Sequence, residues 1–388
     1  MDSCDVLIAG GGPAGSSCAW ALASSGLSVM VLDKARFPRD KVCGGWITPQ
    51  VMQTLAIDAD DYARGRTLQP ITGFRISSMG GRDVKVPFQQ VVSYGIRRCE
   101  FDEYLLQRCG ARIREGVALT RIERLSDGWL VNGEIKARVL VGAGGHFCPV
   151  ARALGNGHRE EPVVAQEIEF VMTPDQVSQC AVQGELPELF FSRDFKGYGW
   201  CFRKNNILNI GLGRLDQHGL PEHVDRFVQW LQATGKTPFG LPGRLRGHAY
   251  LLLGYSPRLL VADGALLIGD AAGLAYAPSG EGIRTAVESG VLAAQAITEA
   301  EGSFRLEQLQ VYRALLEDRF QTKFGAGEPP LTWRIPQSVR NFAGRLLLKS
   351  KSFCRHTVME RWFLHLHQPG LIAMAPGRAR AGAESRAS

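Results

Sequence analysis

The chain has 388 residues, of which 45% are hydrophobic and 21% are charged. This composition is typical of a globular protein and argues against a disordered, fibrous or multi-span membrane chain. At this length, two intertwined domains are a better expectation than one compact core. Nine cysteines occur without any C-x-x-C pair, which fits neither a disulfide framework nor a zinc site. We therefore expect no metal site and a reducing, cytoplasmic location.

The net charge of +7 is concentrated near the C-terminal end. Residues 340–388 contain nine Lys or Arg and two Glu, so the basic and acidic residues before them balance. A basic tail on a neutral body favours attraction to an anionic membrane surface or an acidic protein partner. It does not favour nucleic acid, because no recognition motif is present, and a solvated basic face is an equally good interpretation. No apolar stretch is long enough to span a membrane, so any membrane location is expected to be peripheral.

A strand, a glycine-rich turn and a helix are predicted at the N-terminal end. The apolar run 5–9 leads directly into GGGPAG at 10–15, and a helix is predicted over 16–23. A second strand over 27–32 ends at Asp33, 23 positions after the first turn glycine, where an acid that binds a ribose is expected. Together these elements predict dinucleotide binding, and the alternative is a purely structural turn of an α/β fold.

Three glycines of this turn are expected to have separate roles. Gly10 permits the tight turn, Gly12 lets the backbone approach a pyrophosphate, and Gly15 lets the helix pack on the strand. The helix N-terminus would then present its amides to the phosphates. The further candidate contacts of this region are Pro13, Ala14, Asp33 and Lys34.

A second motif lies far along the chain. The sequence LLIGDAAG at 266–273 predicts a buried strand that ends in an acid, and PSGEGI at 278–283 precedes a helix predicted to about residue 300. This motif resembles the flavoprotein hydroxylase superfamily, in which a Gly-Asp at this point binds the ribityl chain of FAD. The positive end of the helix would face the flavin ring. The resemblance implies cofactor contacts at Gly269, Asp270, Gly280, Gly282 and Ile283.

Two shorter segments also resemble this superfamily. The sequence RCEFD at 98–102 is similar to its R-x-x-F-D helix start, which implies that Arg98 contacts the cofactor, although a surface helix cap is the alternative. The sequence VGAGG at 141–145 resembles its G-A-D-G turn, but Gly144 replaces the aspartate. That departure weakens any expectation of NADPH handling in the usual hydroxylase manner. No second dinucleotide fingerprint is present, so NAD(P)H or another reductant would act transiently.

Within the superfamily, the sequence is most similar to the geranylgeranyl reductase family, over most of residues 1–300. One match is KVCGG at 41–45, which is similar to the family's K-x-C-G-G segment beside the flavin. Its two glycines would let backbone lie against a flat ring, and a thiol there could donate a proton or exchange electrons. The resemblance implies that Cys43 is catalytic, and the alternative is a buried, inert cysteine. Lys41, Gly44 and Gly45 are implied cofactor contacts.

A second match to this family is GYGWCF at 197–202, in a predicted strand, which resembles its Y-x-W-x-F-P segment with Arg203 in place of the proline. Tyr198, Trp200 and Phe202 share one strand face by period two and are the predicted substrate contacts. Ordinary sheet core is the alternative, slightly favoured for Phe202. The third match is the form of the PSGEGIRTA turn at 278–286.

The resemblance implies an α/β fold in which a Rossmann-type FAD-binding domain is interleaved with an antiparallel-sheet substrate domain and followed by C-terminal helices. The expected FAD-binding parts are 1–65, 93–160 and 255–300, and the expected substrate parts are 66–92 and 161–254. Residues 301–376 are expected to form the helical region, and 377–388 a disordered tail. Within the helical region, segments 345–349 and 361–364 alternate basic and apolar residues, as an interfacial helix would. The alternative is that these segments pack on the substrate sheet.

The implied function is reduction of carbon–carbon double bonds of an apolar, prenyl-type substrate, by hydride from flavin N5, with Cys43 or water supplying the proton. The alternative is a flavin-dependent monooxygenase, or less favourably a halogenase, that acts on an aromatic molecule or on a tryptophan of a partner protein. A non-catalytic flavin-binding protein is a third interpretation, which the intact Cys43 segment disfavours.

Overall fold

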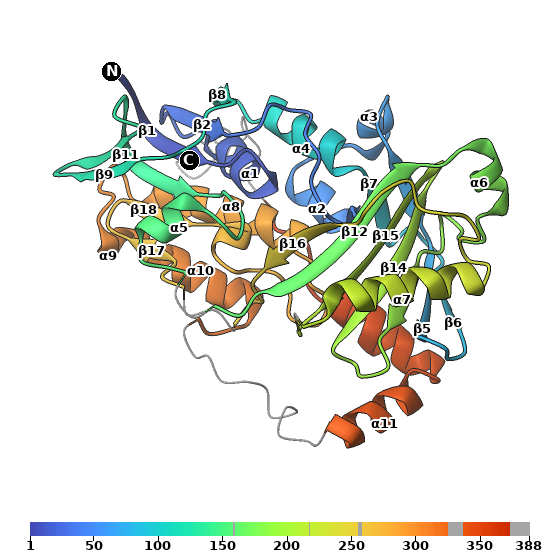
Figure 1. The fold of residues 1–388 in the computed structure, drawn as a ribbon. Helices are drawn as coiled ribbons and strands as arrows, with labels where there is room; N and C mark the ends of the chain where they lie inside the picture. Colours follow the sequence, from blue (N-terminus) through green and yellow to red (C-terminus); the bar gives the residue numbers. More distant parts are fainter. Residues whose placement is uncertain (158–159, 217, 255–257, 325–336, 373–388) are drawn as a thin grey trace, which may run out of the picture.

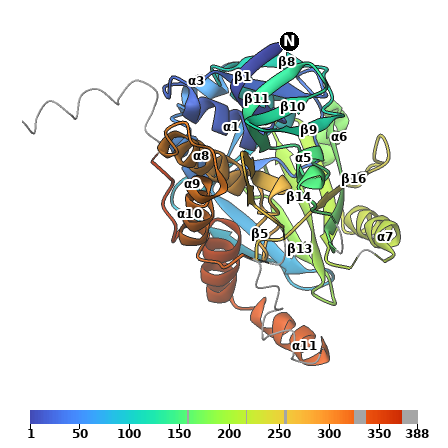
Figure 2. The same cartoon turned by 90° about the vertical axis from the view of Figure 1, so that its left-hand side faces the viewer.

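The computed structural model describes residues 1–157, 160–216, 218–254, 258–324 and 337–372. Two large sheets dominate the fold, with helices packed against both (Figures 1 and 2). The predicted α/β architecture, with a Rossmann-like sheet, a second and mainly antiparallel sheet and C-terminal helices, is confirmed. The predicted tail at 377–388 lies outside the described residues.

The first sheet has eight strands, and its five central strands run parallel. Except in the edge strand at Arg112–Glu115, where Ile113 is exposed, their apolar side chains are largely buried on both faces, as in sheets with helices on each side. In spatial order the strands are β17 (Val261–Ala262), β18 (Ala265–Leu267), β11 (Ile135–Gly142), β1 (Asp2–Ala9), β2 (Val29–Asp33) and β8 (Arg112–Glu115), with β10 (Gly128–Val131) on β11 and β9 (Ile122–Leu125) on β10.

Two helices meet where the first sheet faces the rest of the molecule. Helix α1 (Pro13–Leu22) packs against α8 (Ile283–Glu299), and a Cβ on Gly290 would lie 2.4 Å from the carbonyl oxygen of Ala14. This glycine therefore permits the close approach that brings both helix N-termini to one place. The other helices around this sheet are α4 (Arg98–Gln107), α5 (Pro149–Ala153), α9 (Leu306–Leu309) and α10 (Val311–Phe320).

The second sheet has seven strands, and α7 (Leu220–Ala233) covers one of its faces with Val224, Phe227 and Leu231. All neighbouring strands are antiparallel except β13 and β5, which run parallel. The order is β16 (Arg246–Tyr250), β12 (Val163–Val171), β15 (Ile207–Arg214), β14 (Gly197–Lys204), β13 (Glu188–Phe191), β5 (Gly73–Ser78) and β6 (Val84–Pro87). Its face away from α7 looks toward the first sheet and carries the alternate residues of β14.

A small third sheet joins the two large ones. It consists of β3 (Trp46–Ile47), β7 (Ser93–Ile96) and β4 (Leu68–Ile71). The short helices α2 (Pro49–Thr54) and α3 (Ala59–Ala63) lie beside it, while α6 (Pro174–Gln179) follows β12. Because β3 follows directly after residues 43–45, this sheet fixes the position of the loop that carries them.

The C-terminal part of the chain returns to the second sheet (Figure 1). A π-helix, η3 (Phe353–Phe363), buries Cys354, Val358 and Met359 in a cluster with residues of β5, β6 and β14. Sheet packing, the alternative interpretation, is therefore the one observed for segment 361–364. Helix α11 (Gln337–Leu347) instead projects from the body with its apolar side chains exposed (Figure 2). None of the described helices is long and apolar enough to cross a bilayer.

A buried ion cluster fastens this C-terminal segment to α8. Arg284, in the first turn of α8, is only 1% exposed and pairs with Glu288, which also binds Arg319 of α10. The guanidinium of Arg284 donates to the backbone carbonyls of His365 (3.3 Å), Gln368 (2.7 Å) and Pro369 (3.1 Å). Residues 365–369 are thus held against the N-terminal part of α8.

Candidate active site

One cavity of about 590 Å³ lies between the two large sheets. It is lined by the β1–α1 turn, the 39–46 loop, the start of α8 and the open face of the second sheet. Of the 20 site residues predicted from the sequence, 18 line this cavity. They are Gly10, Gly12, Pro13, Ala14, Asp33, Lys34, Lys41, Cys43, Gly44, Gly45, Arg98, Tyr198, Trp200, Phe202, Asp270, Gly280, Gly282 and Ile283.

The two remaining predicted residues, Gly15 and Gly269, do not line the cavity. A Cβ on Gly15 would lie 1.9 Å from the carbonyl oxygen of Gly10, so this glycine lets α1 pack on the turn, the role predicted for it. Gly269 has a positive φ of 58°, and a Cβ there would approach Ala14 at 2.9 Å. Both positions therefore shape the backbone behind the site, and direct cofactor contact at them stays a prediction.

One end of the cavity is made mainly of backbone. Gly10 has φ of 122°, and a Cβ on it would lie 2.4 Å from the carbonyl oxygen of Ala143. The carboxylate of Asp33 accepts from the amides of Gly11 (2.8 Å) and Ala35 (2.8 Å), which fixes the acid at the end of β2. The guanidinium of Arg39 reaches over the N-terminus of α1 beside Gly12, and its buried Nη1 has no hydrogen-bond partner within the described residues.

The middle of the cavity holds a polar cluster around Asp270. His248 of β16 lies with Nε2 3.4 Å from the Asp270 carboxylate and Nδ1 3.1 Å from the Lys41 ammonium. Burial works to raise the pKa of Asp270, but His248, Lys41 and Arg98 outweigh burial and lower it. Burial lowers the pKa of Lys41, and the charge of Asp270 opposes this change. Asp270 is therefore held as a carboxylate that accepts hydrogen bonds, as ribityl hydroxyls would require.

The loop that carries Cys43 is fixed on both sides. The Cys43 carbonyl accepts from the side-chain amide of Asn209 (3.2 Å), and its sulfur accepts from the amide of Gly45 (3.5 Å). Gly45 has φ of 66°, and a Cβ there would collide with the carbonyl of Ile96 and with Lys204. A Cβ on Gly44 would lie 3.2 Å from the ring of Phe202. The loop therefore presents bare backbone and a partly buried thiol to the cavity.

Arg98 lies beneath this loop at the start of α4. It binds Asp102 with two hydrogen bonds of 2.8 Å, and Asp102 also pairs with Arg39 at 3.2 Å. Burial opposes the charge of Arg98, but Asp102 and the nearby Cys43 outweigh burial and raise the pKa of the guanidinium. The site therefore contains a permanently positive group beside the thiol.

The second sheet contributes an aromatic wall, formed by Tyr198, Trp200 and Phe202 of β14. The pairing of β14 with β15 places all three on one strand face, which confirms the period-two prediction. Trp46 stacks on Phe202 at a centroid distance of 5.4 Å. Phe363 of η3 contacts Trp46 (5.7 Å) and Tyr198 (5.3 Å) edge-on. The wall is therefore continuous and apolar, and it is closed by the C-terminal segment.

Two carboxyl groups of β12 lie beside this wall in different environments. Glu169 is paired with the buried ammonium of Lys204 at 2.6 Å and with Arg97 at 3.5 Å. Glu167 is 4% exposed, lines the cavity and accepts a hydrogen bond from the amide of Cys43. Burial raises the pKa of Glu167 to about 7, against the opposing effects of the Cys43 amide and Lys204.

Sequence reasoning missed several residues that line the cavity. They are Arg39, Trp46, Glu167, His248, Tyr250 and Phe363. Arg39 and Trp46 flank the K-x-C-G-G segment, so proximity to that motif was an available signal. The charged and aromatic residues Glu167, His248 and Tyr250 alternate with other residues in β12 and β16. Their placement depends on strand register, which no local motif encodes.

The residues present fit FAD. A backbone cradle with an unpaired guanidinium nitrogen at the start of α1 suits a pyrophosphate, and the Asp33 carboxylate suits a ribose. The Asp270 carboxylate lies between this end and the glycine-rich segments 43–45 and 280–282, where a flat ring can lie against backbone. Helix α8, 17 residues long, begins at Ile283 and directs its N-terminus toward the same place.

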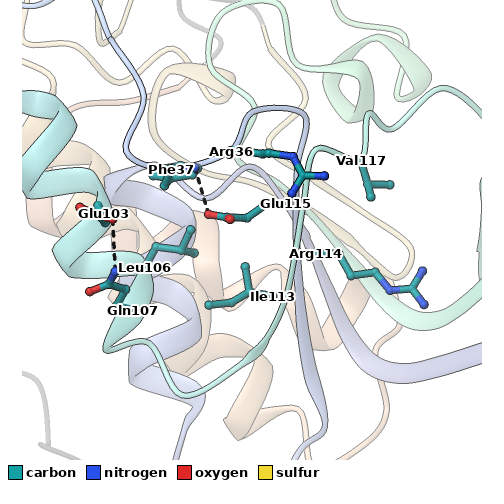
Figure 3. Close-up of a pocket in the computed structure, with 9 residues that line it drawn as sticks. All are labelled: Arg36, Phe37, Glu103, Leu106, Gln107, Ile113, Arg114, Glu115 and Val117. Atoms are coloured by element: carbon teal, nitrogen blue, oxygen red, sulfur yellow. Dashed lines mark hydrogen bonds between the residues drawn. The ribbon is translucent and has the colours of Figure 1, made fainter.

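A second hollow of about 620 Å³ lies beside β8 and α4 (Figure 3). It shares Val117 with the main cavity and contains none of the predicted site residues. Its carboxylates make local contacts, because Glu115 accepts from the amide of Phe37 (3.1 Å) and Glu103 accepts from Gln107 (3.3 Å). The carboxylates of this hollow are therefore bound by neighbouring residues, and its lining residues do not suggest a second active site.

Comparison with known proteins agrees with this site. Residues 3–314 match the FAD binding domain family. Geranylgeranyl diphosphate reductase from Rhodobacter capsulatus is 31% identical over 331 residues, covering 80% of this chain and 79% of that protein. Menaquinone reductase from Mycobacterium tuberculosis is 29% identical over 348 residues, covering 83% and 82%.

Solved structures show the same fold. A geranylgeranyl bacteriochlorophyll reductase-like protein from Thermoplasma acidophilum superimposes with a TM-score of 0.71 at 21% identity, covering 90% of this chain and 88% of that one. The halogenase PltM, solved with FAD, gives a TM-score of 0.64 at 20% identity, covering 81% and 74%. At these identities the likeness describes the fold alone.

Proposed function

The chain belongs to the geranylgeranyl reductase family of FAD-dependent oxidoreductases, and we propose that it reduces carbon–carbon double bonds of an apolar, prenylated substrate. The observation that supports this most directly is the continuity of the cavity. From the glycine-rich segments that fit the flavin ring, the cavity continues along the aromatic wall of Tyr198, Trp200 and Phe202. A wall of this kind suits an extended hydrocarbon chain and excludes water from it.

The substrate class is supported by the names of relatives. Those names specify geranylgeranyl diphosphate for the Rhodobacter protein and digeranylgeranylglycerophospholipid for a protein from Methanothermobacter thermautotrophicus, which is 28% identical over 336 residues. We propose NAD(P)H or another transient reductant as the electron donor. The chain contains one dinucleotide fingerprint, and its glycines line the cavity that fits FAD, so the fingerprint is assigned to FAD and not to a second, resident dinucleotide.

The chain's own residues prepare the site for this chemistry. Bound FAD would supply a hydride from N5 of its reduced ring. Asp33, Arg39 and Asp270 would hold the cofactor, while the loop around Cys43, which lines the cavity, would present a thiol and bare backbone to the flavin ring and the substrate. Trp46 and Phe363 close the wall, so the double bond would lie in a water-poor environment in which developing charge interacts strongly with protein groups.

The test is an anaerobic single turnover. Enzyme loaded with FAD is reduced with dithionite, mixed with geranylgeranyl diphosphate or a geranylgeranylated lipid, and analysed by absorbance and mass spectrometry. We expect flavin reoxidation without oxygen and a product heavier by two hydrogens. If prenyl compounds have no effect and oxygen instead yields a hydroxylated or halogenated aromatic product, the reductase proposal is wrong.

Two cysteine variants extend this test to the predicted catalytic residue. Cys43→Ala should slow the turnover while FAD stays bound, because the thiol faces the cavity and the backbone of the loop does not change. Cys201→Ala is the matched control, since Cys201 lies on the same strand as Trp200 but is buried on the opposite face. Equal rates for both variants would remove Cys43 from the mechanism.

We also propose that α11 docks the enzyme on an anionic membrane that carries the substrate. Its apolar residues Val339 (53% exposed), Phe342 (73%) and Leu346 (60%) are spaced three and four apart, so they share one helix face. Arg345, Lys349 and Lys351 are exposed on and just after this helix. An exposed apolar face flanked by basic groups is complementary to anionic lipid.

The position of α11 supports this proposal further. A Cβ on Gly344 would lie 2.8 Å from the ring of Phe195, so the helix rests on the turn between β13 and β14. From Phe195, ring contacts lead through Phe191 (6.3 Å) to Tyr198 (6.0 Å) of the aromatic wall. A helix in contact with lipid would therefore lie at one end of the path that a prenyl chain follows.

A further inference from the structure

Glu167 stands out among the polar groups of the cavity because part of it lacks a partner. Its Oε1 accepts from the Cys43 amide, while the buried Oε2 has no hydrogen-bond partner among the described residues. The side chain is 4% exposed and lines the cavity on the face of β12 that looks toward the Cys43 loop. A buried carboxyl oxygen without a donor favours the neutral, protonated acid.

The surrounding charges do not compensate Glu167. Lys204 of β14 and Arg97 are both bound by Glu169, the next residue on the same face of β12. Arg246 of β16 lies opposite Glu167 in the pairing of β12 with β16, but its guanidinium contacts Asp40 at 3.4 Å. Asn209 of β15 donates its amide to Cys43 and Glu169. Burial accordingly dominates and raises the pKa of Glu167 to about 7.

We propose that Glu167 is a catalytic residue that donates the proton in double-bond reduction. The inference rests on the proposed function and assigns the acid of that same site. The O–H bond of the carboxyl breaks and a C–H bond forms at one carbon of the double bond. Bound, reduced FAD would supply the hydride for the other carbon. The resulting carboxylate regains its proton from solvent before the next turnover. A general acid is most effective when its pKa lies near the working pH.

A positioning role for Glu167 is the competing explanation, because Oε1 also fixes the Cys43 amide. The Glu167→Gln variant separates the two roles, since its amide oxygen still accepts from Cys43 but carries no transferable proton. We expect unchanged FAD occupancy and a turnover rate at least ~100-fold lower, within the usual range for loss of a general acid. The pH–rate profile of the parent enzyme should fall as pH rises through about 7, and this limb should be absent in the variant.

A second measurement observes the proton without turnover. Infrared difference spectra of the FAD-loaded enzyme, recorded across pH without substrate, should show a protonated carboxyl that ionises near pH 7. Glu281 also lines the cavity, and burial raises its pKa to about 7, so a Glu281→Gln variant identifies its contribution. The signal that remains in Glu281→Gln should vanish when Glu167→Gln is combined with it.

The outcomes distinguish this inference from the function on which it depends. If Glu167→Gln reduces a prenyl substrate as fast as the parent enzyme, or if the carboxyl signal that remains in Glu281→Gln survives when Glu167→Gln is combined with it, Glu167 is not the proton donor and the reductase proposal stands. If the parent enzyme itself fails to reduce any prenyl compound while the infrared signal is present, the proposed function fails and the buried acid remains to be explained by another reaction.

Discussion

The two ends of the main cavity are built from different materials. At the nucleotide end, the surface is mostly backbone: the turn at 10–15 and the N-terminus of α1, with Asp33 held by two amides. At the sheet end, the surface is mostly side chains of β12, β14, β16 and η3. Where the backbone itself forms the surface, an added side-chain atom would collide with it, so these positions must be glycine or another small residue. A side-chain surface can be changed residue by residue, so the specificity of the enzyme is expected to reside there.

The strongest test of this contrast is Gly10→Ala. The substitution adds one carbon at a position with φ of 122°, 2.4 Å from the carbonyl oxygen of Ala143, so the turn must shift. We expect FAD affinity to fall by at least ~1,000-fold, which is about 4 kcal/mol. The measurement is flavin content after purification and by titration. The control is Gly26→Ala, which also has positive φ but has no atom within 4 Å, and should retain FAD.

At the sheet end, Trp200→Ala should leave FAD binding largely intact but change the wall. The indole is 8% exposed, and its Nε1 donates to Asn209 at 2.7 Å, so truncation leaves a cavity and an unsatisfied amide. We expect a loss of about 3 kcal/mol in the free energy of unfolding and a preference for bulkier substrates, measured by thermal melting and substrate competition. Trp230→Ala on α7, which packs on Phe190 on the opposite sheet face, should cost stability without altering substrate preference.

The pH dependence of stability sharpens the contrast at Glu167. The pKa of Glu167 in the folded protein is about 7, above the usual 4.5. The protonated acid therefore contributes fully to the free energy of unfolding below about pH 4.5, and this contribution is lost as the pH rises through 7. Glu167→Gln stays neutral and avoids this loss. Above pH 7 the variant should be more stable by about 3 kcal/mol, and below pH 4.5 the two proteins should be alike. Denaturant unfolding at pH 4.5 and 8 checks this, and a gain of equal size at both values would contradict it.

The smallest effect is expected outside the cavity, at α11. Phe342→Glu places a charge on the exposed apolar face and should weaken binding to vesicles of phosphatidylglycerol by roughly tenfold, about 1 kcal/mol. Turnover of a detergent-dispersed substrate should not change. Val171→Glu, at a position 58% exposed at the end of β12, is the matched control and should bind vesicles as the parent does. Equal loss in both variants would indicate a general charge effect, and no loss in Phe342→Glu would remove α11 as the docking element.

Sequence patterns predicted the residues of the nucleotide end more completely than those of the sheet end. The turn glycines and Asp33 are close in sequence to the strands and the helix that position them, so their spacing located them. Asp270 was located by the resemblance of its motif to the flavoprotein hydroxylase superfamily. Tyr198 and Trp200 were located because a strand alternates its faces. Glu167 and His248 could not be located, because their facing depends on how β12 and β16 pair with strands elsewhere in the chain.

The C-terminal segment shows the same limit in another form. The alternation of basic and apolar residues predicted an interfacial helix equally for 345–349 and 361–364. The structure exposes Arg345, Leu346 and Leu347 but buries Phe363 and Leu364 against the second sheet. An amphipathic pattern states that a helix has an apolar face but not what covers that face, so only the tertiary contacts separate the two segments.

The attachment of this segment to Arg284 has a consequence for how the family can diverge. Arg284 holds residues 365–369 through three main-chain carbonyls, which every amino acid provides. Substitutions at positions 365, 368 and 369 that preserve the backbone path would keep these bonds, whereas a change at Arg284 would abolish all three and leave Glu288 short of a partner at the base of α8. Sequence change is thus expected to be permitted at positions 365, 368 and 369 and restricted at Arg284 and at Arg319, which also donates to the Pro369 carbonyl.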